Sequence, residues 1–166
     1  MQIRCALVGM PGSGKSTVGR HLAQRLKVPF IDLDHQLEQV LKTSIRQFFE
    51  AEGEARFRDI EAQVLAKVTA RPGGMVLSTG GGAVLRPENR QVLRDFGNVL
   101  YLRASPEEIF KRVKHDRTRP LLPVNNPLQK LRELYAQRDA LYRDAATYVI
   151  ETGRPTVQTL VNMIMM

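Results

Sequence analysis

The chain has 166 residues, of which 43% are hydrophobic and 25% charged, as expected for one globular domain with its own core. No apolar run approaches 18 residues, which argues against a membrane-spanning helix, and the single cysteine, Cys5, excludes an internal disulfide. The net charge is +8, but the basic residues are spread along the chain, and 18 of the 25 are arginines, which suit small anionic substrates as well as nucleic acid.

Residues 3–8 form an apolar run that predicts a buried parallel strand, and residues 15–26 carry apolar residues at helical spacing. Between them, residues 9–17 fit the phosphate-binding pattern G-x-x-x-x-G-K-[ST]. In this motif Lys15 reaches the β- and γ-phosphates and the Ser16 hydroxyl ligates Mg²⁺. The alternative is a glycine-rich turn that binds nothing, but the order strand, loop, helix is the context that the motif requires. The segment therefore predicts a nucleoside triphosphate site.

The next apolar run, residues 28–31, predicts a second strand that ends at Asp32 and Asp34. Ligands of parallel sheets bind at the carboxyl ends of strands, so both carboxylates are expected to face the phosphate loop. One of them can support Mg²⁺, and the other can accept a hydroxyl proton from an acceptor substrate. The alternative is that Asp34 only caps the helix that follows.

Helical spacing recurs over residues 35–42, 45–50 and 54–70. In the last of these segments Arg58 lies at the edge of the apolar stripe, and Glu61 follows at the spacing that allows it to orient the guanidinium group.

Residues 75–78 predict a third strand, and three consecutive glycines, Gly80, Gly81 and Gly82, follow its carboxyl end. Glycine permits the backbone to approach a ligand closely, so we interpret this triplet as the wall of a binding pocket. A plain flexible turn is the alternative.

A helix over 88–95, a strand over 98–102 and a helix over 106–114 come next. Residues 115–127 contain three prolines and two asparagines and form no regular element. A loop of this length is functional or disordered, and we interpret it as a mobile lid over the triphosphate; a disordered connector is the alternative.

The helix expected over 127–144 places Arg138 on the stripe that should be buried, between Tyr135 and Tyr142. A buried guanidinium without an anion is costly, so Arg138 must pair with an internal carboxylate or with a ligand. Together with Arg58 it suggests a substrate that carries a carboxylate. Internal salt bridges to Asp32, Asp34 or Glu61 remain the alternative.

A last strand over 147–150 and a helix over 156–165 complete an alternation of strands and helices. This pattern predicts an α/β fold: a single three-layer domain over residues 1–166, with a five-stranded parallel sheet flanked by helices on both faces.

These segments, taken in order, resemble the shikimate kinase family of nucleoside-monophosphate-kinase-like P-loop proteins. The resemblance rests on residues 9–17, Asp32-Leu33-Asp34, Phe57-Arg58-Asp59-Ile60-Glu61, Gly80-Gly81-Gly82, Arg119-Pro120-Leu121-Leu122 and Arg138-Asp139-Ala140-Leu141-Tyr142. It implies transfer of the ATP γ-phosphoryl group to the 3-hydroxyl of shikimate, with Mg²⁺ as cofactor, on the pathway to chorismate and aromatic amino acids. It also implies a lid at about 112–126 and a substrate-binding helical region at about 33–61.

The resemblance assigns roles by position. It implies three catalytic residues, which are Lys15, Asp34 and Arg119. It implies a shikimate pocket formed by Asp34, Arg58, Gly80, Gly81, Gly82 and Arg138. It implies nucleotide binding by Gly12, Ser13, Gly14, Lys15, Ser16, Thr17, Arg112, Arg119, Arg154 and Pro155, and metal binding by Ser16 and Asp32.

At two positions the resemblance is less clear. Leu33 stands where the family often has a small or polar residue, and we expect its side chain to point away from the carboxylates because alternate strand residues face opposite sides. Arg117 lies two residues before Arg119, so either arginine can be the one that closes on the phosphate.

We expect a cytoplasmic monomer that binds ATP and shikimate but neither nucleic acid nor membrane. Cys5 in an apolar strand fits a reducing compartment, and a strand at the N-terminus leaves no room for a signal peptide. The rival hypotheses are a gluconate or nucleoside monophosphate kinase of the same fold, a nucleic-acid-dependent ATPase, and a non-catalytic nucleotide-binding module.

Overall fold

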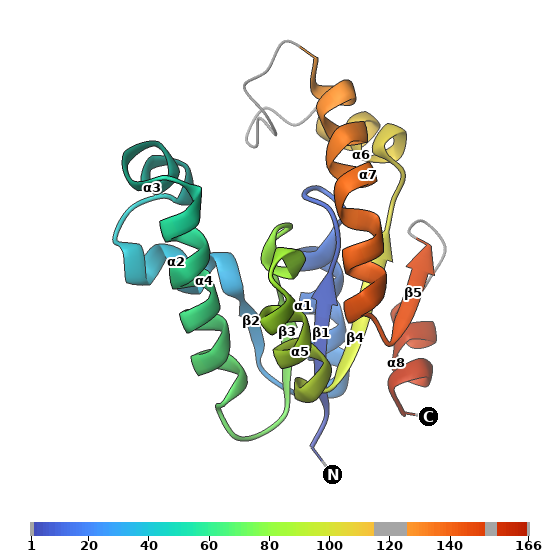
Figure 1. Cartoon of the computed structure of the whole chain (residues 1–166). Coiled ribbons are helices and arrows are strands. Elements are labelled where there is room, and N and C mark those ends of the chain that lie inside the picture. The colour runs from blue at the N-terminus through green and yellow to red at the C-terminus, as the bar shows by residue number, and fades with distance from the viewer. Residues whose placement is uncertain (1, 115–125, 152–155, 166) are drawn as a thin grey trace.

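A computed structural model of the chain describes residues 2–114, 126–151 and 156–165, and its centre is a five-stranded sheet in the order β2-β3-β1-β4-β5 (Figure 1). Every neighbouring pair of strands is parallel. Parallel neighbours need long crossover connections, and here helices supply them. The predicted single-domain α/β fold with a five-stranded parallel sheet is confirmed.

The strands are β1 (Arg4–Val8), β2 (Phe30–Asp32), β3 (Met75–Ser78), β4 (Asn98–Arg103) and β5 (Tyr148–Glu151). The α-helices of the described ranges are α1 (Lys15–Leu26), α2 (Leu33–Leu41), α3 (Ile45–Glu52), α4 (Glu54–Thr69), α5 (Pro87–Phe96), α6 (Pro106–Val113), α7 (Pro127–Ala145) and α8 (Val157–Met165). A short 3-10 helix, η1 (Ala83–Leu85), follows the glycine triplet.

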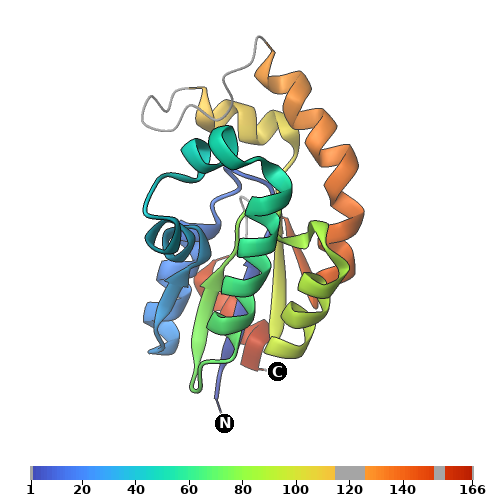
Figure 2. The ribbon, with the colours of Figure 1, turned by 60° about the vertical axis from the view of Figure 1, so that its left-hand side comes forward.

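The sheet separates two apolar cores. On one face α4, α5 and α7 lie side by side (Figure 2) and pack with the other helices of this face against Ala6 and Val8 of β1. On the other face α1 and α8 cover Cys5 and Leu7 of the same strand. Because successive strand residues point to opposite faces, a sheet covered on both sides requires strands that are apolar throughout. This explains the uninterrupted apolar run at the start of the chain.

The second strand differs from its prediction at both ends. β2 begins at Phe30 and ends at Asp32, and α2 begins at Leu33, two residues earlier than the helical spacing indicates. The reason is a helix cap: Asp32 Oδ1 accepts a hydrogen bond of 3.0 Å from the backbone N–H of Asp34. Asp32 therefore caps α2. Asp34, the cap in the alternative interpretation, lies inside the first turn of the helix.

The carboxyl ends of the strands carry the segments that the sequence singled out. The phosphate loop follows β1, the two aspartates end β2 or follow it directly, and the glycine triplet comes after β3. In an open parallel sheet this edge is where ligands bind. As for membrane insertion, no helix in the described ranges combines the length and the apolar character that crossing a bilayer requires.

Candidate active site

The phosphate loop connects β1 to α1 and holds the Lys15 side chain against itself. Lys15 Nζ donates hydrogen bonds of 2.8 Å to the carbonyl oxygen of Gly9 and 2.9 Å to that of Met10. The residue is 8% exposed, and burial lowers the pKa of its ammonium group to about 8, although the charges of Asp34 and Asp32 oppose this shift. The backbone carbonyl groups of the loop thus hold the Lys15 ammonium group in the site, and no acidic side chain is needed to hold it.

A cleft of about 380 Å³, which we call the phosphate-loop cleft, opens above this loop. Its lining includes five of the predicted nucleotide-binding residues of the loop, which are Gly12, Gly14, Lys15, Ser16 and Thr17. Ser13, the sixth, is 2% exposed and lies within the loop, where its hydroxyl oxygen has no hydrogen-bond partner among the described residues. Arg112 of α6 also lines the cleft and donates a hydrogen bond of 3.1 Å to the carbonyl oxygen of Ser13.

Two of the cleft residues suit a hard cation. The Ser16 hydroxyl donates to Asp32 Oδ2 at 3.1 Å, so a hydroxyl and a carboxylate stand side by side beneath the phosphate loop. Mg²⁺ prefers oxygen ligands and binds proteins through one or two of them plus phosphates and water. Within the described residues no group of three or more His, Cys, Asp or Glu side chains is placed to hold a metal by itself. The donor set thus fits a magnesium ion that is shared with a nucleotide.

Asp34 lies at the border between the phosphate-loop cleft and a second, smaller cavity. It lines both of them, together with Pro11, Gly80 and Gly81. Burial raises the pKa of the Asp34 carboxyl group to about 6, and the charge of Asp32 adds to this effect while Lys15 opposes it. A carboxylate with this pKa is a better proton acceptor near neutral pH than an ordinary aspartate.

The smaller cavity, which we call the acceptor pocket, has a volume of about 180 Å³. It gathers all the residues that the sequence assigned to shikimate, namely Asp34, Arg58, Gly80, Gly81, Gly82 and Arg138. They come from α2, α4, the loop after β3 and α7. The apolar side chains of Ile45, Phe49 and Phe57, together with Pro11 and the acidic Glu61, complete its lining.

Arg58 is held by acidic neighbours on its own helix. Its Nη1 donates to Glu61 Oε1 at 2.8 Å and its Nη2 donates to Glu54 Oε1 at 3.3 Å. Glu61 is 1% exposed, and burial raises the pKa of its carboxyl group although the Arg58 cation opposes that shift. The predicted pairing of Arg58 with Glu61 is thus present in the structure, and it is also the internal salt bridge that the sequence left as the alternative for this arginine.

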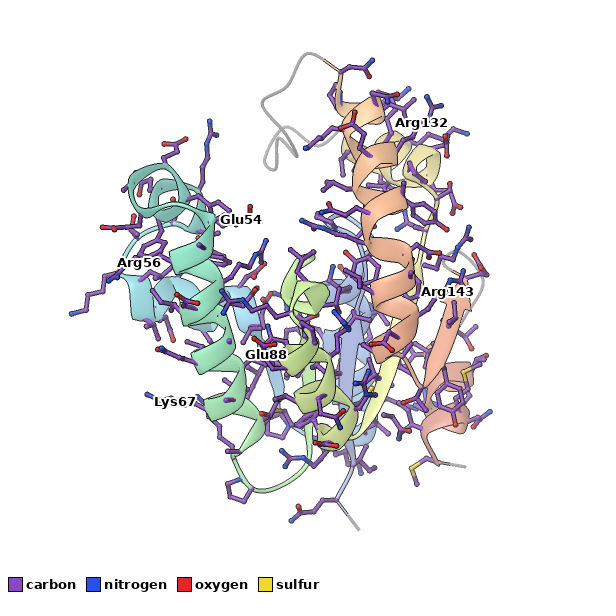
Figure 3. The ribbon with its side chains drawn as sticks, viewed as in Figure 1. Glu54, Arg56, Lys67, Glu88, Arg132 and Arg143 are labelled. Atoms are coloured by element: carbon purple, nitrogen blue, oxygen red, sulfur yellow. The ribbon has the colours of Figure 1, made fainter. Side chains whose placement is uncertain are left out.

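Arg138 reaches the acceptor pocket from α7, which stands on the other side of the pocket from α4. Figure 3 labels Glu54 on α4 and Arg132 on α7, and it shows that these two helices stand apart from each other. The Nε atoms of Arg58 and Arg138 are both buried and have no hydrogen-bond partner among the described residues. Both arginines line the acceptor pocket, and two guanidinium groups at one small cavity favour an anionic ligand there.

Two glycines of the triplet allow charged side chains to approach the loop. A Cβ atom on Gly80 would lie 2.7 Å from Asp34 Oδ1, and a Cβ atom on Gly82 would overlap the guanidinium group of Arg58. The absence of side chains here is therefore a requirement of contact with Asp34 and Arg58, and a flexible turn is not needed to explain the glycines.

Leu33 does point away from the carboxylates, but for a different reason from the predicted one. Asp32 is the last residue of β2, whereas Leu33 and Asp34 belong to α2, so strand alternation does not apply. Leu33 is fully buried in the core on the α4 face of the sheet, while the two aspartates line the cleft. The turn of the helix separates them.

Sequence reasoning missed several lining residues. Thr79 and Arg20 line the phosphate-loop cleft, and Ile45 and Phe49 line the acceptor pocket. The adjacent residues Phe48 and Phe49 of α3 were a usable signal, because neighbouring residues of a helix do not share one face and so cannot both pack against the same core. The predicted residues Arg119, Arg154 and Pro155, the lid residues 115–125 and Arg117 lie outside the described residues.

Comparison with known proteins agrees with this geometry. The family model described as shikimate kinase matches residues 11–166. The shikimate kinase of Paracidovorax citrulli (strain AAC00-1) is 58% identical over 154 residues, which cover 92% of this chain and 84% of that protein.

Solved structures give the same result. The shikimate kinase from Acinetobacter baumannii, in complex with shikimate, is 44% identical with a TM-score of 0.89, and the match covers 99% of this chain and 92% of that one. The enzyme from Bacteroides thetaiotaomicron is 28% identical with a TM-score of 0.92 over the full length of both chains. From this match over nearly its whole length, the chain belongs to the shikimate kinase family.

Proposed function

We propose that this protein transfers the γ-phosphoryl group of ATP to the 3-hydroxyl group of shikimate, giving shikimate 3-phosphate and ADP, on the route to chorismate. The observation that carries the proposal is the position of Asp34, which lines both the phosphate-loop cleft and the acceptor pocket. Phosphoryl transfer requires the donor phosphate and the acceptor hydroxyl to meet in line, and the common wall of two cavities is where this can happen.

On the donor side, the backbone of Gly12, Ser13 and Gly14 and the first turn of α1 with Thr17 cradle the phosphates. Lys15 exchanges its bonds to the Gly9 and Met10 carbonyl oxygens for the β- and γ-phosphates. Ser16 and Asp32 would hold the magnesium ion, which neutralises phosphate charge when it is bound. Arg112, which already contacts the phosphate loop, flanks the nucleotide.

On the acceptor side, Arg58 and Arg138 bind the carboxylate of shikimate from opposite walls of the acceptor pocket. The Gly80–Gly82 backbone lines one side of the ring. Asp34 binds the ring hydroxyls, orients the attacking oxygen and accepts its proton late in the transfer. Its raised pKa, set mainly by burial, suits this role.

The transition state of phosphoryl transfer is loose, so positioning and charge stabilisation dominate catalysis. We propose that Arg119 in the lid region at about 112–126 supplies further positive charge, and that Arg154 and Pro155 flank adenine; these assignments rest on the sequence resemblance alone. The region 33–61 is proposed to act as the substrate-binding part. Its α3 and α4 supply apolar and charged lining to the acceptor pocket.

The deciding experiment compares ADP release from ATP with shikimate, gluconate and AMP as acceptors. We expect release to depend on shikimate and to stay at the level of slow hydrolysis with the other two compounds. Release with gluconate or AMP instead would favour one of the related small-molecule kinases, and stimulation by DNA or RNA would favour a nucleic-acid-dependent ATPase.

We further propose that the protein acts as a cytoplasmic monomer without a nucleic-acid or membrane partner. Cys5, its one cysteine, is buried in β1 as a free thiol, and burial raises the pKa of this thiol to about 12. Such a group contributes to packing and fits a reducing compartment.

A further inference from the structure

Tyr142 of α7 is fully buried, yet it carries a polar hydroxyl group that the proposed mechanism does not use. This hydroxyl donates a hydrogen bond of 2.6 Å to the carbonyl oxygen of Gly81, in the middle of the glycine triplet. Arg138 lies one helical turn before Tyr142 on the same helix. One helix therefore supplies a guanidinium group to the acceptor pocket and a hydrogen bond to the loop that forms another wall of that pocket.

The planarity of the peptide bond gives this hydrogen bond a consequence for the pocket. The carbonyl group of Gly81 and the N–H group of Gly82 stand on opposite edges of one trans peptide. When Tyr142 holds the carbonyl oxygen on its side, the N–H group of Gly82 is directed to the opposite side. Gly82 and Arg58 both line the acceptor pocket, and they pack directly against each other.

The hydroxyl group of Tyr142 is itself well fixed. Its ring packs on that of Tyr101 with a centroid distance of 5.0 Å, and the Tyr101 hydroxyl donates to Asp139 Oδ1 at 2.7 Å. Burial raises the pKa of Tyr142 to about 12, although the Arg138 cation opposes this shift, so the phenol remains protonated and able to donate. The pair of rings thus presents a rigid donor to the loop.

A second buried donor holds the next part of the same loop. Asn89 of α5 is 3% exposed, and its Nδ2 donates to the carbonyl oxygen of Ala83 at 3.1 Å. The Ala83 N–H group in turn donates to the carbonyl oxygen of Gly80 at 3.2 Å. The triplet lacks side chains that would restrict it, so hydrogen bonds from α5 and α7 replace that restriction.

We propose that Tyr142 is a positioning residue for the acceptor substrate: its hydrogen bond to Gly81 fixes the glycine loop relative to Arg138, so that both bind shikimate as one rigid surface. This inference rests on the proposed function, because it names the acceptor that the rigid surface serves. Tyr142 does not line the acceptor pocket, so it acts through the loop and the arginine that do.

The test replaces Tyr142 by phenylalanine, which removes one hydroxyl group and keeps the aromatic pair. A buried carbonyl oxygen left without its donor loosens the loop, and we expect the KM for shikimate to rise about tenfold while the KM for ATP stays within about twofold. Tyr135→Phe is the matched control, because it removes the hydroxyl group of another tyrosine of α7, one that accepts a hydrogen bond of 2.8 Å from Arg103 Nε instead of bonding to the loop. The control is expected to lower stability without changing the KM for shikimate. An unchanged KM in Tyr142→Phe, or an equal rise in both KM values, would overturn the inference.

A second measurement is independent of turnover. Relaxation of the ¹⁵N backbone amides in the substrate-free protein is expected to show Gly82 as rigid as β3 in the wild type and more mobile in Tyr142→Phe. If the variant does not fold, the wild-type protein provides the test: a Gly82 amide that is clearly more mobile than the amides of β3 would contradict the proposal. If the wild type releases no ADP with shikimate, the proposed function fails, and the amide data still test whether Tyr142 fixes the loop.

Discussion

The two halves of the site satisfy their charged groups in different ways. The donor half consists of the phosphate loop and Asp32, and the acceptor half consists of Asp34, Arg58, Gly80–Gly82 and Arg138. In the donor half Lys15 bonds to its own loop and Ser16 bonds to Asp32. In the acceptor half the Nε atoms of both arginines are buried without partners in the described residues. The donor half thus pairs its cation and its metal-ligand candidates internally, with the Ser13 hydroxyl as an exception, whereas the acceptor half places two guanidinium groups at the lining of one cavity, which favours an anionic acceptor.

Because of this difference, we expect mutations in the acceptor half and mutations in the donor half to have different effects. Changes in the acceptor half should alter recognition of shikimate and leave the nucleotide largely unaffected. The following predictions test that separation, from the largest expected effect to the smallest.

Asp34→Asn should reduce kcat by about 10²–10⁴-fold, because the amide can neither orient the hydroxyl group as a carboxylate does nor accept its proton. ATP affinity, measured by calorimetry, should remain near that of the wild type. Asp59→Asn is the control, because Asp59 is an exposed residue of α4 that pairs with Arg86 away from the pocket. Near-normal turnover by Asp34→Asn would remove the role assigned to this residue.

Arg138→Leu should raise the KM for shikimate by about 100-fold, because it removes a charged hydrogen-bond donor from a buried site. The KM for ATP should change little. Arg132→Leu, on the same helix, breaks only a surface pair with Glu107 that is worth at most about 1 kcal/mol, and it should leave both constants unchanged. A similar loss of both affinities in Arg138→Leu would instead indicate that Arg138 is a structural ion-pair partner.

Gly82→Ala should raise the KM for shikimate about tenfold, because the added methyl group displaces the Arg58 guanidinium group from its position against the loop. Steady-state kinetics with ATP varied provide the internal control, since Gly82 does not line the phosphate-loop cleft. An unchanged KM for shikimate would show that Arg58 binds equally well from a shifted position.

Asp34→Asn should also stabilise the protein without ligands, by a few degrees in Tm at pH 7.5. Burial raises the folded-state pKa of Asp34 to about 6, so keeping this carboxylate ionised costs free energy above that pH. The cost is absent below the unfolded-state pKa of about 4, so the gain should shrink as the pH falls from 7.5 to 4. A lower Tm for the variant at pH 7.5 would mean that Lys15 and the neighbouring dipoles outweigh the burial of Asp34.

The sequence was sufficient for the fold and for most of the site because its signals are local. The apolar strands, the phosphate loop and the Arg58–Glu61 pair each depend on residues within one turn or one loop. The acceptor half was predicted mainly through its resemblance to a family, since four separate elements build it.

Other features had no local signal. The bond between Tyr142 and Gly81 joins residues 61 positions apart, and no spacing rule connects them. The start of α2 was placed two residues late because Asp32 serves at once as strand end, helix cap and neighbour of Ser16. A residue with several tertiary roles does not follow a single local preference.

The central claim is that a donor half and an acceptor half meet at Asp34. Its most direct test is to measure ADP release with shikimate, with the methyl ester of shikimate and with 3-deoxyshikimate. We predict rapid release with shikimate, a greatly raised KM for the ester, which lacks the anion for Arg58 and Arg138, and only background release with the 3-deoxy compound at saturation. Equal release with shikimate and the 3-deoxy compound, or an ester that performs as well as the free acid, would contradict the account.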